Sequence, residues 1–174
     1  MSFLYPGEYL ESVYSIDFKK LYEEGYRGVI FDIDNTLVHH GAPANARVIA
    51  LFEHLHDCGF STMLLSNNKE PRVKSFCEGA YAGGYIYKAG KPKPANYKKA
   101  MERMGTDTSN TIFIGDQIFT DVWGANLAGI RSILVKPMNP KEEIQIILKR
   151  IPEKLVLAAY FISQRRQEKQ RRKK

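Results

Sequence analysis

The sequence predicts an α/β fold in which a mostly parallel sheet is covered by helices on both faces. Short apolar runs alternate with amphipathic stretches along the chain, and glycine follows several of these stretches, where helices commonly end. Strands that alternate with helices form parallel sheets covered on both faces. The 174 residues, 26% charged and 44% hydrophobic, suit one globular domain or one domain with a tail.

Five apolar runs have the length and residue types of buried strands. The first is Val-Ile-Phe-Asp-Ile, and each of the others holds three or four mainly apolar residues between polar segments. The strands expected from this pattern are 29–33, 62–65, 85–87, 111–114 and 132–135.

Amphipathic stretches between these runs predict the helices. In 44–58, apolar residues recur at three- and four-residue spacing from Val48 to Leu55, and Gly59 follows. Residues 1–27 form a helical or irregular lead-in. The other expected helices are 71–77, 94–104 before Gly105, 121–128 before Gly129, and two that Pro152 separates, 140–151 and 153–170.

The net charge of +7 is concentrated at the C-terminus. Residues 163–174 hold seven Lys or Arg and one Glu, so the first 162 residues carry a net charge of only +1. A nucleic-acid groove across the whole body is therefore disfavoured. The chain divides into a lead-in (1–27), a main domain (28–162) and a basic tail (163–174), which follows the apolar run 155–162.

Three roles remain open for the basic tail. It is a solvated helix end, a contact with an anionic membrane or a contact with RNA or the ribosome. Aromatic residues do not interleave the basic run, which disfavours sequence-specific recognition of RNA.

Several protein classes are excluded by composition. Two cysteines, Cys58 and Cys77, provide neither a disulfide framework nor a zinc cluster. No apolar run approaches the roughly 18 residues of a membrane span. The first ten residues contain Glu8 and no basic flank, unlike a signal peptide, so the expected compartment is the cytoplasm.

Polar side chains end three of the expected strands. Asp32 and Asp34 end the first strand, Ser66 and Asn67 follow the second, and Asp116 follows the fourth. Ligands of open parallel sheets bind outside the carboxyl ends of the strands, where the strand order reverses. We therefore expect these side chains to meet at one site.

The residue types at these strand ends suit phosphoryl transfer. Clustered carboxylates repel one another unless a cation lies among them, and oxygen ligands without His or Cys favour Mg²⁺. One carboxylate can then attack phosphorus while another carries the proton. Ser66 and Asn67 supply hydrogen-bond donors for a phosphoryl group, and Lys91, before Pro92, supplies a positive charge.

At these residues the sequence resembles the haloacid-dehalogenase (HAD) superfamily of phosphatases. Its four motifs match in order as Asp-Ile-Asp-Asn-Thr-Leu at 32–37, Leu-Ser-Asn at 65–67, Lys-Pro at 91–92 and Gly-Asp at 115–116. Asn35 and the form Gly-Asp-Gln-x-x-Thr-Asp of the fourth motif are similar to the YqeG-type group of subfamily IIIA, which is itself similar to phosphatidylglycerophosphate phosphatases. The resemblance implies a Rossmann-like sheet with its first predicted strand at the centre.

The resemblance also implies catalytic and metal-binding roles for four aspartates. Asp32 would be the nucleophile and a ligand to Mg²⁺. Asp34 would be the general acid and base, with its backbone carbonyl on the metal. Asp116 would be the third protein ligand, and Asp121 a metal neighbour that acts through water. An alternative for Asp121 is to cap the helix after Thr120.

Three further residues would hold the transferring phosphoryl group, namely Ser66, Asn67 and Lys91. His39 and His40 follow the first strand, where a surface loop is expected, so we expect solvent exposure with at most a minor part in gating substrate.

The spacing of the motifs leaves no room for a cap domain. Asp34 to Ser66 and Ser66 to Lys91 are filled by the expected loops, helices and strands, and a further domain needs about 50 residues. In the family that the chain resembles, small-substrate enzymes usually carry such a cap.

We therefore expect an open site that hydrolyses a large or lipid-borne phosphomonoester, such as phosphatidylglycerophosphate, with Mg²⁺ and an aspartyl-phosphate intermediate. The expected location is the cytoplasm, peripheral to the inner face of the membrane. The alternative is an RNA- or ribosome-associated binding protein with little catalytic activity.

Overall fold

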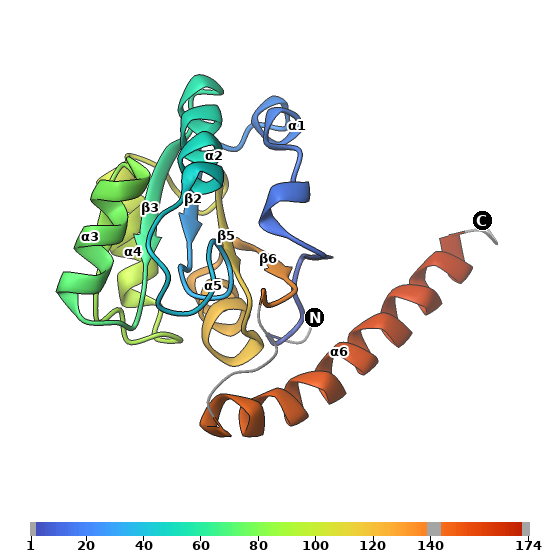
Figure 1. Cartoon of the computed structure of the whole chain (residues 1–174). Coiled ribbons are helices and arrows are strands. Elements are labelled where there is room, and N and C mark those ends of the chain that lie inside the picture. The colour runs from blue at the N-terminus through green and yellow to red at the C-terminus, as the bar shows by residue number, and fades with distance from the viewer. Residues whose placement is uncertain (1–2, 139–143, 172–174) are drawn as a thin grey trace.

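The chain folds around one sheet of six parallel strands in the order β1-β6-β5-β2-β3-β4 (Figure 1). The computed structural model describes residues 3–138 and 144–171. The strands are β1 (Glu8–Leu10), β2 (Gly28–Phe31), β3 (Ser61–Leu65), β4 (Tyr85–Ile86), β5 (Thr111–Gly115) and β6 (Arg131–Val135).

All five predicted strands are present, but the predicted count is wrong because the lead-in supplies a sixth. Strand β1 pairs with β6, with Tyr9 opposite Leu134, at the edge of the sheet. Its three residues, Glu8 to Leu10, are only half-buried, so the strand does not need an apolar residue at every position. The sequence therefore shows no apolar run there that would predict a strand. Backbone pairing with β6 rather than side-chain pattern defines this strand.

Helices cover both faces of the sheet, as predicted. Alternate side chains of β2 point to opposite faces, so Val29 and Phe31 pack under one layer of helices and Ile30 under the other. The first layer comprises α1 (Phe18–Glu23), α2 (Ala46–Asp57) and α3 (Glu70–Ala80), and the second comprises α4 (Ala95–Met104) and α5 (Trp123–Ala128).

Two helix predictions need correction. The expected helix 121–128 is preceded by a wide π-helical turn, η2 (Ile118–Val122), and only then becomes α5. The expected break at Pro152 is absent, because α6 (Ile144–Arg171) runs through it. The missing backbone hydrogen bond is offset by packing further along, where Tyr160 is buried. The expected start at residue 140 lies outside the described residues.

The strand order reverses beside β2. From β2 the chain proceeds outward to β3 and β4, then returns to β5 on the other side of β2. Phe31 lies opposite both Leu64 and Ile114, so β2, β3 and β5 end nearly level. This register brings the residues that follow the three strands to one edge.

Residues 3–138 and 144–171 contain no inserted cap domain over that edge. Among the helices described, none combines the length and the apolar character that a transmembrane span requires.

Candidate active site

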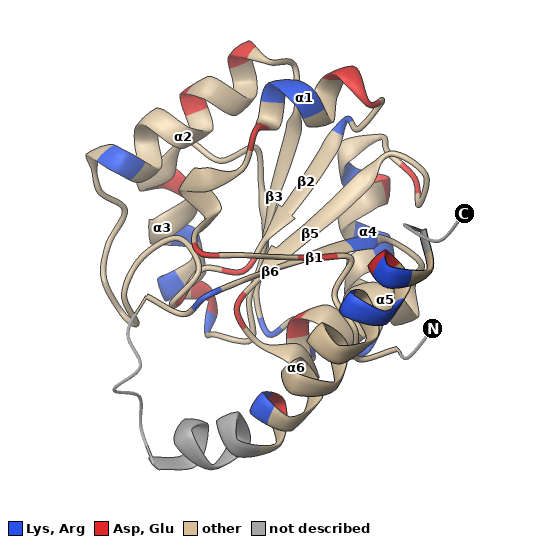
Figure 2. Ribbon diagram, turned by 90° about the vertical axis from the view of Figure 1, so that its right-hand side faces the viewer, with Lys and Arg blue, Asp and Glu red and all other residues tan. Residues whose placement is uncertain are grey.

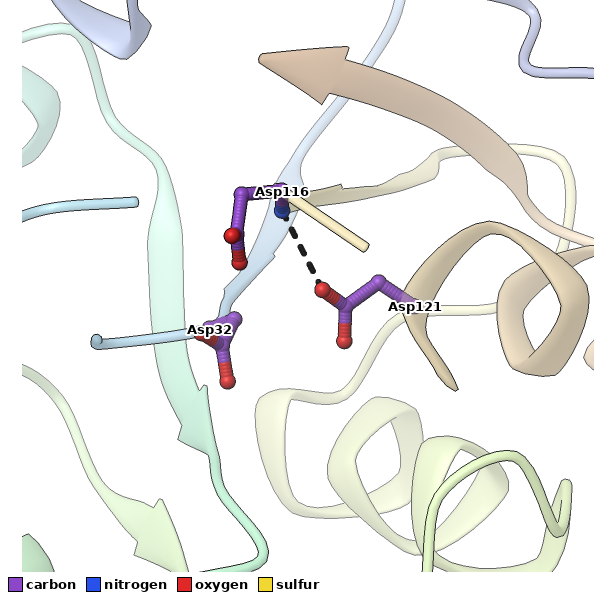
Figure 3. A group of neighbouring side chains, drawn as sticks. All are labelled: Asp32, Asp116 and Asp121. Atoms are coloured by element: carbon purple, nitrogen blue, oxygen red, sulfur yellow. Dashed lines mark hydrogen bonds between the residues drawn. The ribbon is translucent and has the colours of Figure 1, made fainter. Parts of the chain in front are cut away.

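Three buried aspartates meet at the carboxyl edge of the sheet. Asp32 follows β2, Asp116 follows β5 and Asp121 lies in η2, and one carboxylate oxygen from each lies within 4.8 Å of the others (Figure 3). The backbone N–H of Asp32 donates to the carbonyl of Ile114 at 2.9 Å, which continues the pairing of β2 with β5. The sheet thus fixes two of the three carboxylates directly.

Asp121 takes a more direct place in this cluster than the sequence predicted. It is 1% exposed, and its Oδ2 accepts the backbone N–H groups of Asp116 and Gln117 at 3.1 and 3.0 Å. The alternative role as a helix cap is wrong, because the N-cap of α5 is Val122 and no side chain caps that helix or η2. The carboxylate turns back toward β5 and places its other oxygen in the cluster.

Lys91 supplies the positive charge among these carboxylates. Its Nζ donates to Asp32 Oδ1 at 2.5 Å and to Asp121 Oδ1 at 2.7 Å, and the side chain is almost fully buried. Burial by itself lowers the pKa of Lys91, but the carboxylates of Asp121 and Asp32 together raise it above its ordinary value. The lysine therefore stays charged.

The electrostatics of Asp32 are dominated by burial. Burial raises the pKa of Asp32 to about 7 even though Lys91 opposes the shift, and the neighbouring carboxylates of Asp121 and Asp34 raise it further. A second cation at this position would stabilise the ionised form of the nucleophile that we expect here.

Ser66 and Asn67 lie beside the acidic cluster, as predicted. Ser66 Oγ accepts the N–H of Asn68 at 3.2 Å, and Asn67 Oδ1 accepts the backbone N–H of Lys91 at 2.9 Å. A cavity of about 130 Å³ opens over the cluster. Its lining consists of Asp32, Asp34, Asn35, the exposed His40, Ser66, Asn67, Asn68, Lys91, Gln117 and Thr120.

The carboxylate of Asp34 lies outside the three-aspartate cluster. It pairs with Arg72 at 2.9 Å and accepts hydrogen bonds from Asn68 Nδ2 at 2.5 Å and the N–H of Gly41 at 2.8 Å. Asp34 nevertheless lines the cavity. Arg72 comes from α3, and no motif in the sequence indicated it.

The donor set fits Mg²⁺. Three buried carboxylates from separate elements supply hard oxygen ligands, and no His or Cys belongs to this group among the described residues. Thr36 Oγ1 lies 3.4 Å from Asp116 Oδ1 and helps to orient that carboxylate. Asp32 and Asp116 would hold the ion with Asp121 beside them, and the ligand role of the Asp34 backbone carbonyl stays a prediction.

Comparison with known proteins agrees with this architecture. A family model described as HAD-hydrolase-like matches residues 88–143. The chain is 36% identical over 158 residues to the "Probable phosphatase YqeG" of Bacillus subtilis, across 90% of this chain and 91% of that protein. It is 27% identical over 154 residues to the Arabidopsis thaliana "Phosphatidylglycerophosphate phosphatase 1, chloroplastic/mitochondrial", across 83% of this chain but only 44% of that protein.

Solved structures share the fold at low sequence identity. An uncharacterized protein from Listeria monocytogenes serotype 4b aligns with a TM-score of 0.54 and 17% identity, over 68% of this chain and 84% of that one. The cobalt-bound deoxy-D-mannose-octulosonate 8-phosphate phosphatase of Haemophilus influenzae aligns with a TM-score of 0.50 and 15% identity, over 68% and 81%.

The parallel sheet and its acidic carboxyl edge define the class of HAD-like hydrolases. The chain belongs to the HAD superfamily of phosphatases, in its YqeG-type group.

Gly115 leaves the space that Asp121 occupies, and Gly115→Ala is expected to displace that carboxylate. A Cβ at residue 115 would lie 2.5 Å from Asp121 Oδ2, and β5 cannot retreat because it pairs with β2 and β6. We expect the free energy of unfolding to fall by about 1–3 kcal/mol. We also expect the variant to lose most of its activity on an aryl phosphate.

Gly79→Ala is the matched control for this substitution. A Cβ at residue 79 in α3 would meet only Ala44 Cβ, at an ordinary 3.4 Å, and Ala is favoured over Gly inside helices by about 0.5–1 kcal/mol. Denaturant unfolding and phosphate release measure both variants. A Gly115→Ala protein with wild-type stability and rate would contradict the packing argument.

Proposed function

We propose that the protein hydrolyses a phosphomonoester with Mg²⁺ through a phosphoryl group carried on Asp32. The observation that carries this proposal is the cluster of Asp32, Asp116 and Asp121, buried at the carboxyl edge of the sheet and paired with Lys91. Bound Mg²⁺ would neutralise negative charge on the transferring phosphoryl group. Phosphatase activity is common to the family, whereas the metal and the residue roles are part of the proposal.

In the first half of the proposed reaction, an oxygen of Asp32 attacks phosphorus and the bond from phosphorus to the leaving-group oxygen breaks. Asp34 gives a proton to that oxygen, which requires it to exchange its contact with Arg72 for one with the substrate. Lys91, Ser66 and Asn67 hold the phosphoryl oxygens.

In the second half, water attacks the phosphoryl group on Asp32 and gives its proton to Asp34. Inorganic phosphate leaves, and both carboxyl groups return to their initial states. The cycle consumes one water and releases one alcohol and one phosphate.

The small cavity favours a substrate that stays mostly outside the protein. Its volume of about 130 Å³ suits a phosphoryl group. Sites that enclose a whole small molecule usually span about 300–1,000 Å³. We therefore propose a phosphate borne on a lipid, most specifically phosphatidylglycerophosphate. The name of the Arabidopsis relative also supports this choice.

A panel of substrates tests the proposed function. We expect kcat/KM for phosphatidylglycerophosphate in mixed micelles to exceed the values for sugar phosphates and nucleotides, and EDTA to abolish turnover of all of them. A clear preference for a small soluble metabolite would refute the lipid assignment. Full turnover in EDTA would refute the metal-dependent mechanism.

The outer face of α6 supports a peripheral contact with an anionic membrane. Leu155 and Ile162, seven residues apart on that face, are 71% and 53% exposed, and exposed basic residues follow at Arg165, Arg166 and Lys169 (Figure 2). Each basic residue near an anionic surface contributes about 1 kcal/mol. The proposed location is accordingly the cytoplasmic face of the membrane.

Deletion of residues 164–174 is expected to separate membrane binding from catalysis. The residues of α6 that are seen to contact the body include Glu153, Tyr160 and Phe161, and all three precede the deletion. We therefore expect unchanged kcat/KM on a soluble aryl phosphate and at least about tenfold weaker binding to vesicles rich in anionic phospholipid.

Vesicles of neutral phospholipid provide the control for this experiment, since they should bind neither form. Unchanged binding to anionic vesicles would refute the membrane role of the basic residues. Loss of salt-dependent binding to RNA, with vesicle binding retained, would instead favour the RNA-associated alternative.

A further inference from the structure

The turn η2 carries Asp121, so the position of its backbone determines whether the acidic cluster forms. Thr120 in the same turn and Gln117 just before it line the cavity. The hydroxyl of Tyr97, from α4, donates to the carbonyl of Thr120 at 2.8 Å. Contacts from outside the four motifs therefore hold this turn.

The beginning of η2 is held from a different direction, by Glu153 of α6. Glu153 Oε1 accepts the backbone N–H of Ile118, the first residue of η2, at 2.8 Å. The two residues are 35 positions apart in the chain, so only the docking of α6 brings them together. This contact lies three residues before Asp121.

Glu153 is an unusual residue for its surroundings. It is 5% exposed, and an apolar cluster of Ile118, Val122 and Leu134, with Val156 and Leu157 of α6 against it, surrounds this contact. Burial of a carboxylate costs several kcal/mol unless hydrogen bonds compensate. A residue that served packing alone would be apolar at this position.

Aromatic contacts fix the part of α6 that bears Glu153. Tyr160 packs edge-on against Tyr5, and Phe161 against Tyr9 of β1, both with ring centroids 5.7 Å apart. Figure 1 shows α6 passing below β6 before it extends away from the body. The helix is therefore anchored on the C-terminal side of Glu153, by these rings and by the apolar side chains of Val156 and Leu157.

We propose that Glu153 is a positioning residue for the acidic site. Its carboxylate holds the N–H of Ile118 and so keeps η2 in the conformation that places Asp121 beside Asp32 and Asp116. Glu153 is not among the described residues that line the cavity. The inference rests on the proposed function only in treating that cluster as a metal site.

Binding of Mn²⁺ alone, followed by electron paramagnetic resonance on the full-length protein, tests the proposal without a substrate. We expect Glu153→Leu to weaken Mn²⁺ binding by about 10–100-fold, the range typical of residues that orient metal ligands. Glu153→Gln retains an acceptor oxygen and should stay within about threefold of wild type. Glu168→Gln, at an exposed position of α6, is the control.

Hydrogen exchange of the Ile118 amide gives an independent readout. We expect faster exchange in Glu153→Leu than in Glu153→Gln or wild type. If Glu153→Leu does not fold, Glu153→Asp tests the proposal in its place. This variant keeps the charge but shortens the side chain by one methylene, so we expect it to weaken Mn²⁺ binding as well.

Three results would overturn the proposal: wild-type Mn²⁺ affinity in folded Glu153→Leu, equal losses in Glu153→Gln and Glu153→Leu, or wild-type affinity in Glu153→Asp. A wild-type protein that binds no Mn²⁺ would contradict the proposed function instead. In that case the exchange rate of the Ile118 amide tests the positioning role, and equal rates in wild type and folded Glu153→Leu would refute it.

Discussion

Asp32→Asn is expected to abolish turnover while the fold stays intact. The amide is nearly isosteric with the carboxylate but cannot form an acyl phosphate, and removal of a catalytic nucleophile typically costs about 10⁴-fold or more in rate. Asp32 is buried beside Lys91, and an amide oxygen can still accept the hydrogen bond from that lysine. Phosphate release from an aryl phosphate at saturating Mg²⁺ measures the effect, with circular dichroism as the check on folding.

Asp57→Asn is the matched control for the nucleophile. Asp57 ends α2, is exposed and lies away from the cavity, so its substitution should leave the rate within about twofold of wild type. If Asp32→Asn retains more than about 1% of wild-type turnover, the covalent mechanism is wrong.

Lys91→Met is expected to impair both stability and activity. The substitution removes the cation bonded to two buried carboxylates, Asp32 and Asp121. Loss of one partner from a buried ion pair costs about 3–5 kcal/mol. Loss of a charge that stabilises the transition state costs about 10²–10³-fold in kcat. Denaturant unfolding in EDTA and in Mg²⁺ should show that Mg²⁺ recovers part of the stability, because it supplies a replacement cation.

The stability deficit of Lys91→Met should depend on pH. Asp32 already has its pKa raised by burial from 3.8 to about 7, and loss of Lys91 removes the main effect that opposes this shift. A carboxyl group whose pKa is raised on folding binds more protons in the folded state, so stability falls as the pH rises. Below about pH 7 Asp32 is protonated in both folded proteins, so in EDTA we expect the deficit to grow as the pH rises above about 7, where the wild-type carboxyl ionises and that of the variant stays protonated.

Lys93→Met provides the comparison, since Lys93 is exposed two residues further along the same loop. Its substitution should change the free energy of unfolding by less than about 0.5 kcal/mol. A Lys91→Met protein as stable as Lys93→Met in EDTA would show that the buried carboxylates do not depend on Lys91.

The strands that carry the site were predictable because they are buried on both faces. Runs such as Val29–Phe31 at β2 and Ile112–Ile114 at β5 need apolar side chains at every position, and such runs stand out in the sequence. Strand β1 had no such signal, since an edge strand of three half-buried residues depends on backbone pairing with β6.

The sequence alone thus determined the α/β class, the order of the elements and the residues that end β2, β3 and β5. These features are local: they follow from apolar periodicity, from helix-ending glycines and from polar residues placed directly after strands. Asp121 was assigned a place near the metal only because it occupies a motif position that the chain shares with a known family, and the same resemblance strengthened the assignment of Lys91.

The tertiary structure alone decided how those residues are held. It turned Asp121 back toward β5, paired Asp34 with Arg72 and brought Glu153 against Ile118. Each of these contacts joins a carboxylate to a group whose position depends on the packing of another element or on the path of a turn. Side-chain pattern specifies which face of an element is buried, but not which distant polar group will meet it, because that depends on the relative placement of whole helices and strands.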